Sequence, residues 1–196
     1  MTPFVQASAA LAESLLDDPF YWAITEDFGN DLAARMHALI RYFHYSLEEA
    51  ERTGRCILAP DARLGAAAWL LPRSPAVDAA ESSAKCEYLD SALGSRGMEN
   101  YYRIVRHMAP LASRVVPDDA WYLSIIGILP SARGQGLGAS LLASTLAEAS
   151  LANATCYLET FTPRNLRFYE RLGFRLIVDH FEPTTNKEYT VMRRDA

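Results

Sequence analysis

The sequence predicts a single mixed α/β domain, with helices on the faces of a mixed sheet. At 196 residues, with half of them hydrophobic and 22% charged, the chain suits one soluble-type domain with a substantial core. Helical and strand-like apolar patterns alternate along it, without an internal repeat, a low-complexity segment or a long linker. The run 121–161 has a strand, a helix and a second strand in succession, which implies a right-handed crossover between two parallel strands.

The first half is expected to be mainly helical, with one pair of strands. Apolar spacing, helix-ending residues such as Pro19 and Gly54, and the turn-forming segment 60–63 define the elements. They are helices over 4–16 and 30–52, strands over 55–58 and 64–71, and helices over 77–93 and 98–115. The aromatic residues Phe20, Tyr21 and Trp22 fall in a connecting segment between the first two helices.

The second half is expected to alternate strands and helices. It has strands over 121–129 and 155–161, helices over 138–151 and 165–172, and closing strands over 174–181 and 188–192 that pair antiparallel. Composition marks no separable domain, so residues 1–196 are expected to form one unit.

Charge and composition narrow the functional classes. A net charge of −5 argues against general nucleic-acid binding and is compatible with a cationic acceptor or simply with solubility. No apolar run approaches the ~20 residues of a bilayer span, and no secretory leader is apparent, so we expect a cytoplasmic protein without a membrane partner. The three cysteines and four histidines lack zinc-ligand spacing, so no metal site is expected.

A glycine-rich segment, Pro130–Gly138, lies between an expected strand and an expected helix. Gly134, Gly136 and Gly138 leave backbone N–H groups uncovered beside a helix N-terminus, which suits an anion such as a pyrophosphate. Gly134, Gly136 and Ala139, with Glu159 about 20 residues further on, also fit a dinucleotide-binding fingerprint. Residues 130–133 separate them from the strand, however, and too little chain follows to complete a doubly wound parallel sheet.

A second motif helps to decide between these two interpretations of the glycine-rich segment. Arg133, Gly136 and Gly138 match Arg/Gln-x-x-Gly-x-Gly/Ala, and Asn165 to Phe174 match Asn-x-x-Phe-Tyr-Glu-Arg/Lys-x-Gly-Phe. Together they resemble the acyl-CoA-binding half of the GNAT N-acetyltransferases. With the run 157–160, the last third of the chain is similar to the puromycin N-acetyltransferase-like members. One departure is that the family begins with a β-strand, whereas this chain starts almost directly with a helix.

The resemblance implies a mostly antiparallel mixed sheet with one splayed parallel strand pair. It divides the domain into an acceptor-side half, 1–117, and an acyl-CoA-binding half, 118–196. The implied reaction moves an acetyl group from acetyl-CoA to a primary amine of a small molecule by direct attack in a ternary complex. Protein or peptide acetylation, and a non-catalytic acyl-CoA-binding module, are the alternatives; a homodimer is a further expectation.

The resemblance also implies roles for particular residues. Those expected to contact the coenzyme are Ile126, Ile128, Arg133, Gly134, Gly136, Leu137, Gly138, Ala139, Asn165 and Arg171. The Ile128 N–H is expected to polarise the thioester carbonyl, and the Tyr169 hydroxyl to protonate the departing thiolate. Asn165, with Thr162, has the alternative role of a helix cap, and Arg171 that of a solvated helix charge.

The acceptor side is less well marked. Glu159, near the end of its strand, is the best candidate for a general base or amine-orienting group, with a buried structural carboxylate as the alternative. Phe20, Tyr21 and Trp22 are expected either to line the acceptor site or to be ordinary core. His44 and His107 are weaker acceptor-side candidates, because their surroundings are those of ordinary helix histidines.

Overall fold

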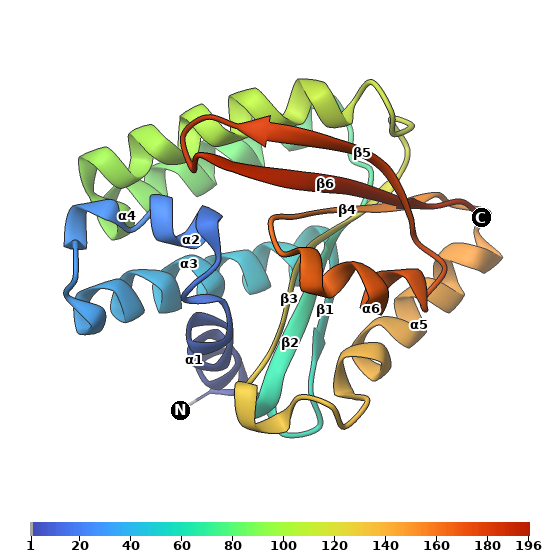
Figure 1. Cartoon of the computed structure of the whole chain (residues 1–196), viewed down its shortest axis with the longest axis horizontal. Coiled ribbons are helices and arrows are strands. Elements are labelled where there is room, and N and C mark those ends of the chain that lie inside the picture. Colours follow the sequence, from blue (N-terminus) through green and yellow to red (C-terminus); the bar gives the residue numbers. More distant parts are fainter. Residues whose placement is uncertain (1) are drawn as a thin grey trace.

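A six-stranded sheet of order β1-β2-β3-β4-β6-β5 forms the centre of the molecule in a computed structural model that describes residues 2–196 (Figure 1). Its strands are β1 (Gly54–Leu58), β2 (Gly65–Leu70), β3 (Trp121–Ile128), β4 (Cys156–Thr160), β5 (Arg175–Glu182) and β6 (Lys187–Arg194). Neighbouring strands are antiparallel except β3 and β4, which are parallel. The predicted mixed, mostly antiparallel sheet with one parallel pair is confirmed.

Helices cover both faces of this sheet. They are α1 (Pro3–Leu15), α2 (Pro19–Ala23), α3 (Leu32–Thr53), α4 (Pro75–Ala112), α5 (Leu137–Leu151) and α6 (Leu166–Glu170). Side chains of α1, α3 and α4 share one hydrophobic core with Ala66 and Ala68, while α5 packs in a second core with Ala67 and Trp69. Because successive strand residues face opposite sides, the fully buried β2 supplies both cores.

The chain starts with a helix, as the sequence predicted, and no strand precedes it among residues 2–196. The side chain of Thr2 caps α1 and Pro3 occupies its first turn, where a missing N–H costs nothing. No helix within this described part of the chain is both long and apolar enough to cross a membrane.

One prediction about helices is wrong, and another is confirmed. Phe20, Tyr21 and Trp22 lie in the short helix α2 rather than in a connecting segment, because Asp18 caps the Phe20 N–H at 3.0 Å and Pro19 starts the turn. The two helices expected over 77–93 and 98–115 are both present within α4, where a kink at Gly94, with φ of 75°, separates them. Asp27 caps the second part by accepting a hydrogen bond from the Arg96 N–H at 2.8 Å.

Strands β3 and β4 separate soon after they meet. They pair only at Trp121 with Cys156 and Tyr122 with Tyr157, so the second half of β3 has no partner on that side. Helix α1 packs against β3 just beyond this point, at Gly127. A Cβ there would overlap the Ser14 hydroxyl and lie 2.7 Å from Leu11 Cδ2, so a larger residue would have to displace these side chains of α1. The opening between the strands positions the site described next.

Candidate active site

A cavity of about 850 Å³ lies beside the glycine-rich loop, and we call it the loop cavity. It is enclosed by the end of β3, the loop that leads into α5, and the segment 162–172 that contains α6. The loop continues from a 3₁₀ turn over Pro130–Ala132 and reaches Gly136, which is the N-cap residue of α5. The cavity therefore meets the positive end of the α5 dipole.

The backbone N–H groups of 134–139 are available to a ligand. None donates a hydrogen bond to a protein acceptor within the described residues 2–196. Gly134 and Gly136 have φ of +78° and +79°, and a Cβ on either would meet no atom within 4 Å. Gly138 is glycine for another reason, since a Cβ would lie 3.2 Å from the Phe168 ring. The loop thus presents amides around open space, as an anion site requires.

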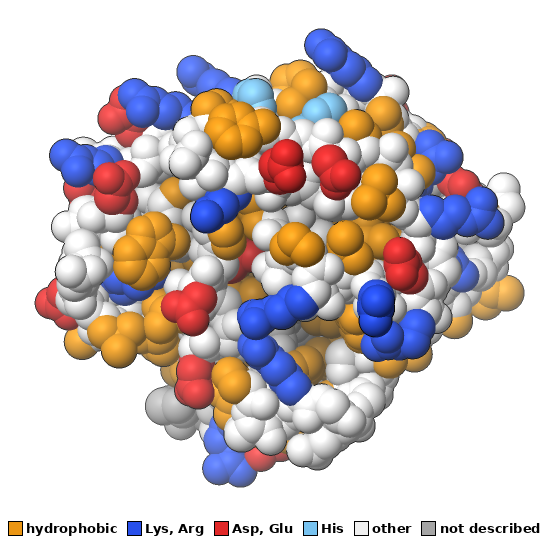
Figure 2. All heavy atoms as spheres, in the orientation of Figure 1, with side chains coloured by type: hydrophobic (Ala, Val, Ile, Leu, Met, Phe, Trp, Pro, Cys, Tyr) orange, Lys and Arg blue, Asp and Glu red, His pale blue; other side chains and the backbone are white. Residues whose placement is uncertain are grey.

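Basic side chains gather at the same cavity. Arg133, Arg164 and Arg171 line it, and Figure 2 shows Lys and Arg side chains around a hollow below the centre of this face. Arg133 is partly engaged: its Nε donates to the Ile128 carbonyl at 3.1 Å and its Nη2 to the Ser14 carbonyl at 3.0 Å. It therefore ties the end of β3 to α1 as well as lining the cavity. Arg164 was not foreseen, because a lone exposed arginine carries no sequence signal.

The unpaired edge of β3 faces the opening between the strands. The Leu129 N–H donates to the Leu64 carbonyl on the β2 side at 2.9 Å. Since backbone groups alternate sides along a strand, the N–H groups of Ile126 and Ile128 face the opposite way, toward the opening. Both residues line the loop cavity, as the sequence predicted for a strand that binds an extended ligand.

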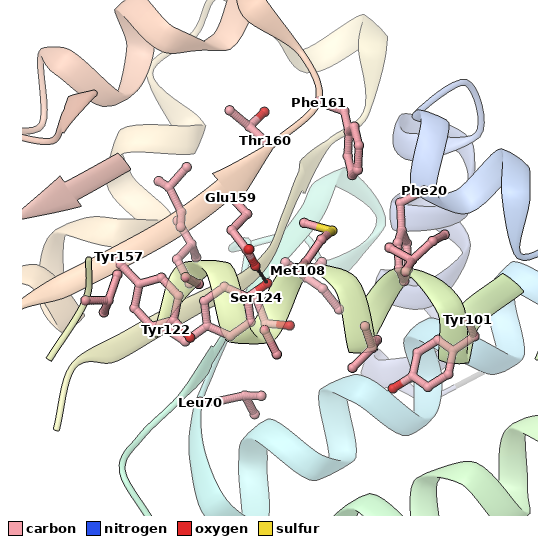
Figure 3. A pocket seen from close by; sticks show the side chains of 18 of the residues that line it. Phe20, Leu70, Tyr101, Met108, Tyr122, Ser124, Tyr157, Glu159, Thr160 and Phe161 are labelled. Atoms are coloured by element: carbon pink, nitrogen blue, oxygen red, sulfur yellow. Dashed lines mark hydrogen bonds between the residues drawn. The ribbon is translucent and has the colours of Figure 1, made fainter. Parts of the chain in front are cut away.

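A second cavity, of about 660 Å³, lies between the sheet and helices α2 and α4, and we call it the sheet cavity (Figure 3). Its aromatic lining includes Phe20, Tyr21, Tyr101 and Phe161. Phe20 packs edge-on against Tyr21 and Tyr101, with ring centroids 5.1 and 6.3 Å apart. Trp22 is not part of this lining: it is 48% exposed and stacks under the Arg35 guanidinium at 3.8 Å.

Glu159 is the buried carboxylate of the sheet cavity (Figure 3). Its Oε2 accepts a hydrogen bond from the Tyr122 hydroxyl at 3.1 Å, whereas its Oε1 is buried without a partner among the described residues. Burial raises the pKa of Glu159 to about 7, and the Tyr122 hydrogen bond opposes this increase. The side chain can therefore exchange a proton near neutral pH, which is the property of a general base.

The two cavities meet at a junction formed by the residues that line both: Leu15, Asp18, Ile126, Asn165 and Tyr169. Burial, and then the nearby Asp18, raise the pKa of Tyr169, so its hydroxyl stays protonated. That hydroxyl has no hydrogen-bond partner within residues 2–196, which leaves its proton available for transfer. Ile128 lies in the loop cavity alone, so the structure brings Ile126 rather than Ile128 to the junction.

Asn165 and Asp18 both line the junction, and the sequence alone settled the role of neither. The Asn165 side chain makes no capping bond to α6, so the capping alternative is wrong, and neither does Thr162 cap the 3₁₀ turn before it. Asp18, read in the sequence only as part of a helix end, lies at the junction with a pKa raised by burial to about 6. No pattern in the sequence marks it, since Asp before Pro is a common helix start.

The histidines lie away from both cavities. His44 is near Glu48 on α3 at 3.4 Å, and His107 Nε2 contacts the Phe181 carbonyl at 3.0 Å. Neither lines the loop cavity or the sheet cavity. No group of three or more His, Cys, Asp or Glu side chains within residues 2–196 is placed to hold a metal ion.

Part of this chain matches a known protein family. The family described as an acetyltransferase (GNAT) domain matches residues 101–176, which include β3, the glycine-rich loop, α5, β4 and α6. Residues 101–176 are therefore similar to a GNAT acetyltransferase domain, a family that uses acetyl-CoA, and this similarity supports an acyl-CoA-dependent acetyltransferase.

Solved structures share the fold over nearly the whole chain. One, titled as histone acetyltransferase HPA2 and related acetyltransferase from Corynebacterium glutamicum, superposes with a TM-score of 0.66 at 22% identity, covering 98% of this chain and 91% of that one. A protein from Pyrococcus horikoshii OT3 superposes with a TM-score of 0.56 at 11% identity, covering 97% and 91%. At these identities the likeness shows the fold. The resemblance to puromycin N-acetyltransferase-like members remains a prediction.

The loop cavity suits the diphosphate end of an acyl-CoA, and Gly136 offers a test. Gly136→Glu places a negative side chain among the amides and should abolish measurable binding of CoA in calorimetry. Gly29→Glu is the matched control, because Gly29 also has a positive φ, of 52°, with no atom near a Cβ, but lies outside both cavities. Unchanged CoA affinity in a folded Gly136→Glu variant would contradict the site.

Proposed function

We propose that this protein transfers an acetyl group from acetyl-CoA to the primary amine of a small molecule, by direct attack of the amine on the thioester. The observation that carries the proposal is the junction. An anion-binding loop cavity and a separate, aromatic-lined sheet cavity meet at Asn165 and Tyr169, with the buried carboxylate of Glu159 in the second cavity. Two substrates can therefore reach the same point from two sides.

The loop cavity would hold the coenzyme. The amides of Gly134, Gly136, Leu137, Gly138 and Ala139 would bind the diphosphate, with Arg133, Arg164 and Arg171 around it. The unpaired backbone of Ile126 and Ile128 and the free amide of Asn165 would hold the pantetheine arm. This arrangement supports a thioester located at the junction, where the coenzyme cavity opens toward the acceptor.

The sheet cavity would hold the acceptor amine. An ammonium group is favoured there by the acidic groups Glu159 and Asp18 and by the aromatic faces of Phe20, Tyr21 and Phe161. Only the neutral amine attacks, so its proton must leave. Glu159, with a pKa of about 7 and an unpartnered Oε1, would take that proton directly or through a water molecule.

Bond breaking would occur at the junction. The amine nitrogen attacks the thioester carbon, the oxygen takes the negative charge, and the C–S bond breaks as the tetrahedral intermediate collapses. The Ile126 N–H, which lies at the junction, would polarise the carbonyl in place of Ile128, a contribution typically of about 2.7–4 kcal/mol. The Tyr169 hydroxyl would give its proton to the departing thiolate.

A peptide amine is the second candidate acceptor. The similar structure from Corynebacterium glutamicum has histone acetyltransferase in its title, so acetylation of a lysine side chain or of a peptide N-terminus belongs in the test. The sheet cavity favours the small molecule. Residues of α4, including Tyr101 and Met108, line it together with Phe161, and this lining suits a compact acceptor with an apolar body.

Acetyl transfer to a panel of amines tests the proposal. We expect acetylated product from arylalkylamines with acetyl-CoA, at higher kcat/KM than from lysine-containing peptides, measured by mass spectrometry and thiol release. A higher kcat/KM for a peptide would show that the acceptor is a peptide amine rather than a small molecule. No transfer to any amine by a protein that binds acetyl-CoA would contradict the proposed reaction.

The same assay tests the role of Tyr169. Tyr169→Phe keeps the ring and removes only the hydroxyl, so kcat should fall by about 10²–10⁴ with little change in CoA affinity. Tyr88→Phe is the control, because Tyr88 of α4 packs against Tyr45 of α3 and lines neither cavity. Near-normal turnover of Tyr169→Phe, with chemistry limiting the rate, would remove Tyr169 from the mechanism.

The pH dependence tests Glu159. Below a pKa of about 7 its carboxyl is protonated and cannot accept a proton, so kcat/KM should rise with pH through that region. Glu159→Gln should show its largest deficit between about pH 7 and the pKa of the amine, where the amine is still charged and the base is active. The deficit should narrow at higher pH, because free neutral amine then becomes abundant.

Two further variants separate a base from a structural carboxylate. Tyr122→Phe removes the hydrogen bond that lowers the pKa of Glu159, so the rising limb should move to higher pH. Glu182→Gln is the structural control: Glu182 is fully buried and accepts from the Thr184 and Thr185 N–H groups. It should lower Tm without changing the shape of the pH profile. A constant deficit of Glu159→Gln at every pH, with a lowered Tm, would make Glu159 structural.

A further inference from the structure

A buried lysine lines the sheet cavity at a place that the proposed acetyl transfer does not use. Lys85, on α4, is 9% exposed and faces the cavity together with Tyr42 and Tyr101. Its ammonium lies 5.5 Å from the centre of the Tyr42 ring. Burial of a lysine is costly, and a well-packed apolar side chain at such a position is often at least as stable. The charge therefore calls for an explanation.

The hydrogen bond to Glu49 uses only one of the donors of Lys85. Lys85 Nζ donates to Glu49 Oε2 at 2.8 Å, and this is its one hydrogen bond within the described part of the chain. Glu49 is shared, because its Oε1 also accepts from Arg73 Nη1 at 3.4 Å, and Arg73 binds the exposed Asp78 as well. An ammonium has three donors. Two donors of Lys85 remain beside the cavity.

The Tyr101 hydroxyl adds a further donor at this end. It has no hydrogen-bond partner among residues 2–196, and Tyr101 lines the same cavity on α4. In Figure 3 Tyr101 lies beside Phe20, across the cavity from Tyr122 and Tyr157. Tyr122 is the hydrogen-bond donor to Glu159, so the Tyr101 hydroxyl lies away from the carboxylate. The charge of Lys85 opposes the increase in the pKa of Tyr101 that burial causes, so Lys85 is near Tyr101.

The sheet cavity is therefore polar at both ends and apolar between them. Glu159 supplies a carboxylate, Lys85 and Tyr101 supply donors, and Met108 lies between Glu159 and Tyr101 (Figure 3). A molecule that satisfies both ends carries an amine at one terminus and an oxygen acceptor at the other. Leaving the far donors without a partner costs binding free energy once water is displaced.

We infer that Lys85, with Tyr101, determines acceptor specificity by binding an oxygen acceptor group, a carbonyl or carboxylate, at the end of the substrate opposite to its reacting amine. This inference rests on the proposed function, because it assigns the acceptor to the sheet cavity. The preferred substrate class is an amine with an apolar middle and a distal carbonyl or carboxylate. The Lys85–Glu49 contact positions the ammonium by fixing it to α3.

A matched series of amines tests this. The series is para-methylphenethylamine and its analogues with a carboxamide or a carboxylate in place of the methyl group. Because hydrogen bonds to a charged donor are the stronger kind, kcat/KM for the better oxygen-bearing analogue should exceed that of the methyl compound by at least about tenfold. Comparison of carboxamide with carboxylate shows whether a neutral or an anionic oxygen is preferred.

Variants of the two donors give the specific result. Lys85→Met should reduce this ratio to about one while changing kcat/KM for the methyl compound far less. Tyr101→Phe should lower the ratio in part. Because it leaves no buried charge without a partner, it still tests the inference if Lys85→Met does not fold. Lys187→Met is the matched control, because Lys187 is exposed on β6 and lines neither cavity.

The inference and the proposed function fail in different ways. Equal use of all three amines by the wild type, or an equal loss for all three in both donor variants, would overturn the role of Lys85 and leave acetyl transfer intact. If no amine is acetylated, the proposed function fails, and calorimetric binding of the same three amines still tests Lys85. In that measurement the oxygen-bearing analogues should bind about tenfold more tightly than the methyl compound, and only while Lys85 is present.

Discussion

The separation of β3 from β4 is the constraint on which the rest of the site depends. Two parallel strands that pair at Trp121 and Tyr122 and then diverge leave one strand with free backbone groups, next to an opening in the sheet. Helix α1 packs against β3 at Gly127, where a Cβ would overlap the Ser14 and Leu11 side chains of the helix. The Arg133 guanidinium adds a tie between the end of β3 and α1.

Burial then sets the chemistry on the acceptor side. The sheet cavity excludes enough water to raise the pKa of Glu159 to about 7 and of Asp18 to about 6, although both groups accept hydrogen bonds that oppose the shift. The same environment raises the pKa of Tyr169 and keeps its hydroxyl protonated. Amine acetylation needs a base that can accept a proton near neutral pH. It also needs an acid that is still protonated when the thiolate leaves.

Local patterns predicted most of the helices and strands correctly, for physical reasons, and the predicted coenzyme-binding residues of the glycine-rich loop line the loop cavity. Positive φ values favour glycine at 134 and 136, and the Phe168 ring favours it at 138. These glycines are close together in the sequence, so the loop can be recognised from a short local pattern. The acceptor side depends on contacts between distant segments. Asp18, Lys85 and Tyr101 line one cavity only when α2 and α4 pack over the sheet, and nothing near them in the sequence marks this. Trp22 was expected with its neighbours, but a helical turn directs it outward to Arg35.

The central claim is that two substrates meet at the junction of Asn165 and Tyr169. A bisubstrate compound, in which the sulfur of CoA is joined through an acetyl bridge to an arylalkylamine, tests this claim directly by calorimetry. If the cavities are continuous, the compound occupies both at once and should bind at least about 100-fold more tightly than CoA or the amine alone, because the second contact becomes intramolecular. An affinity no better than that of CoA would show that the amine part does not enter the sheet cavity, and would contradict the account.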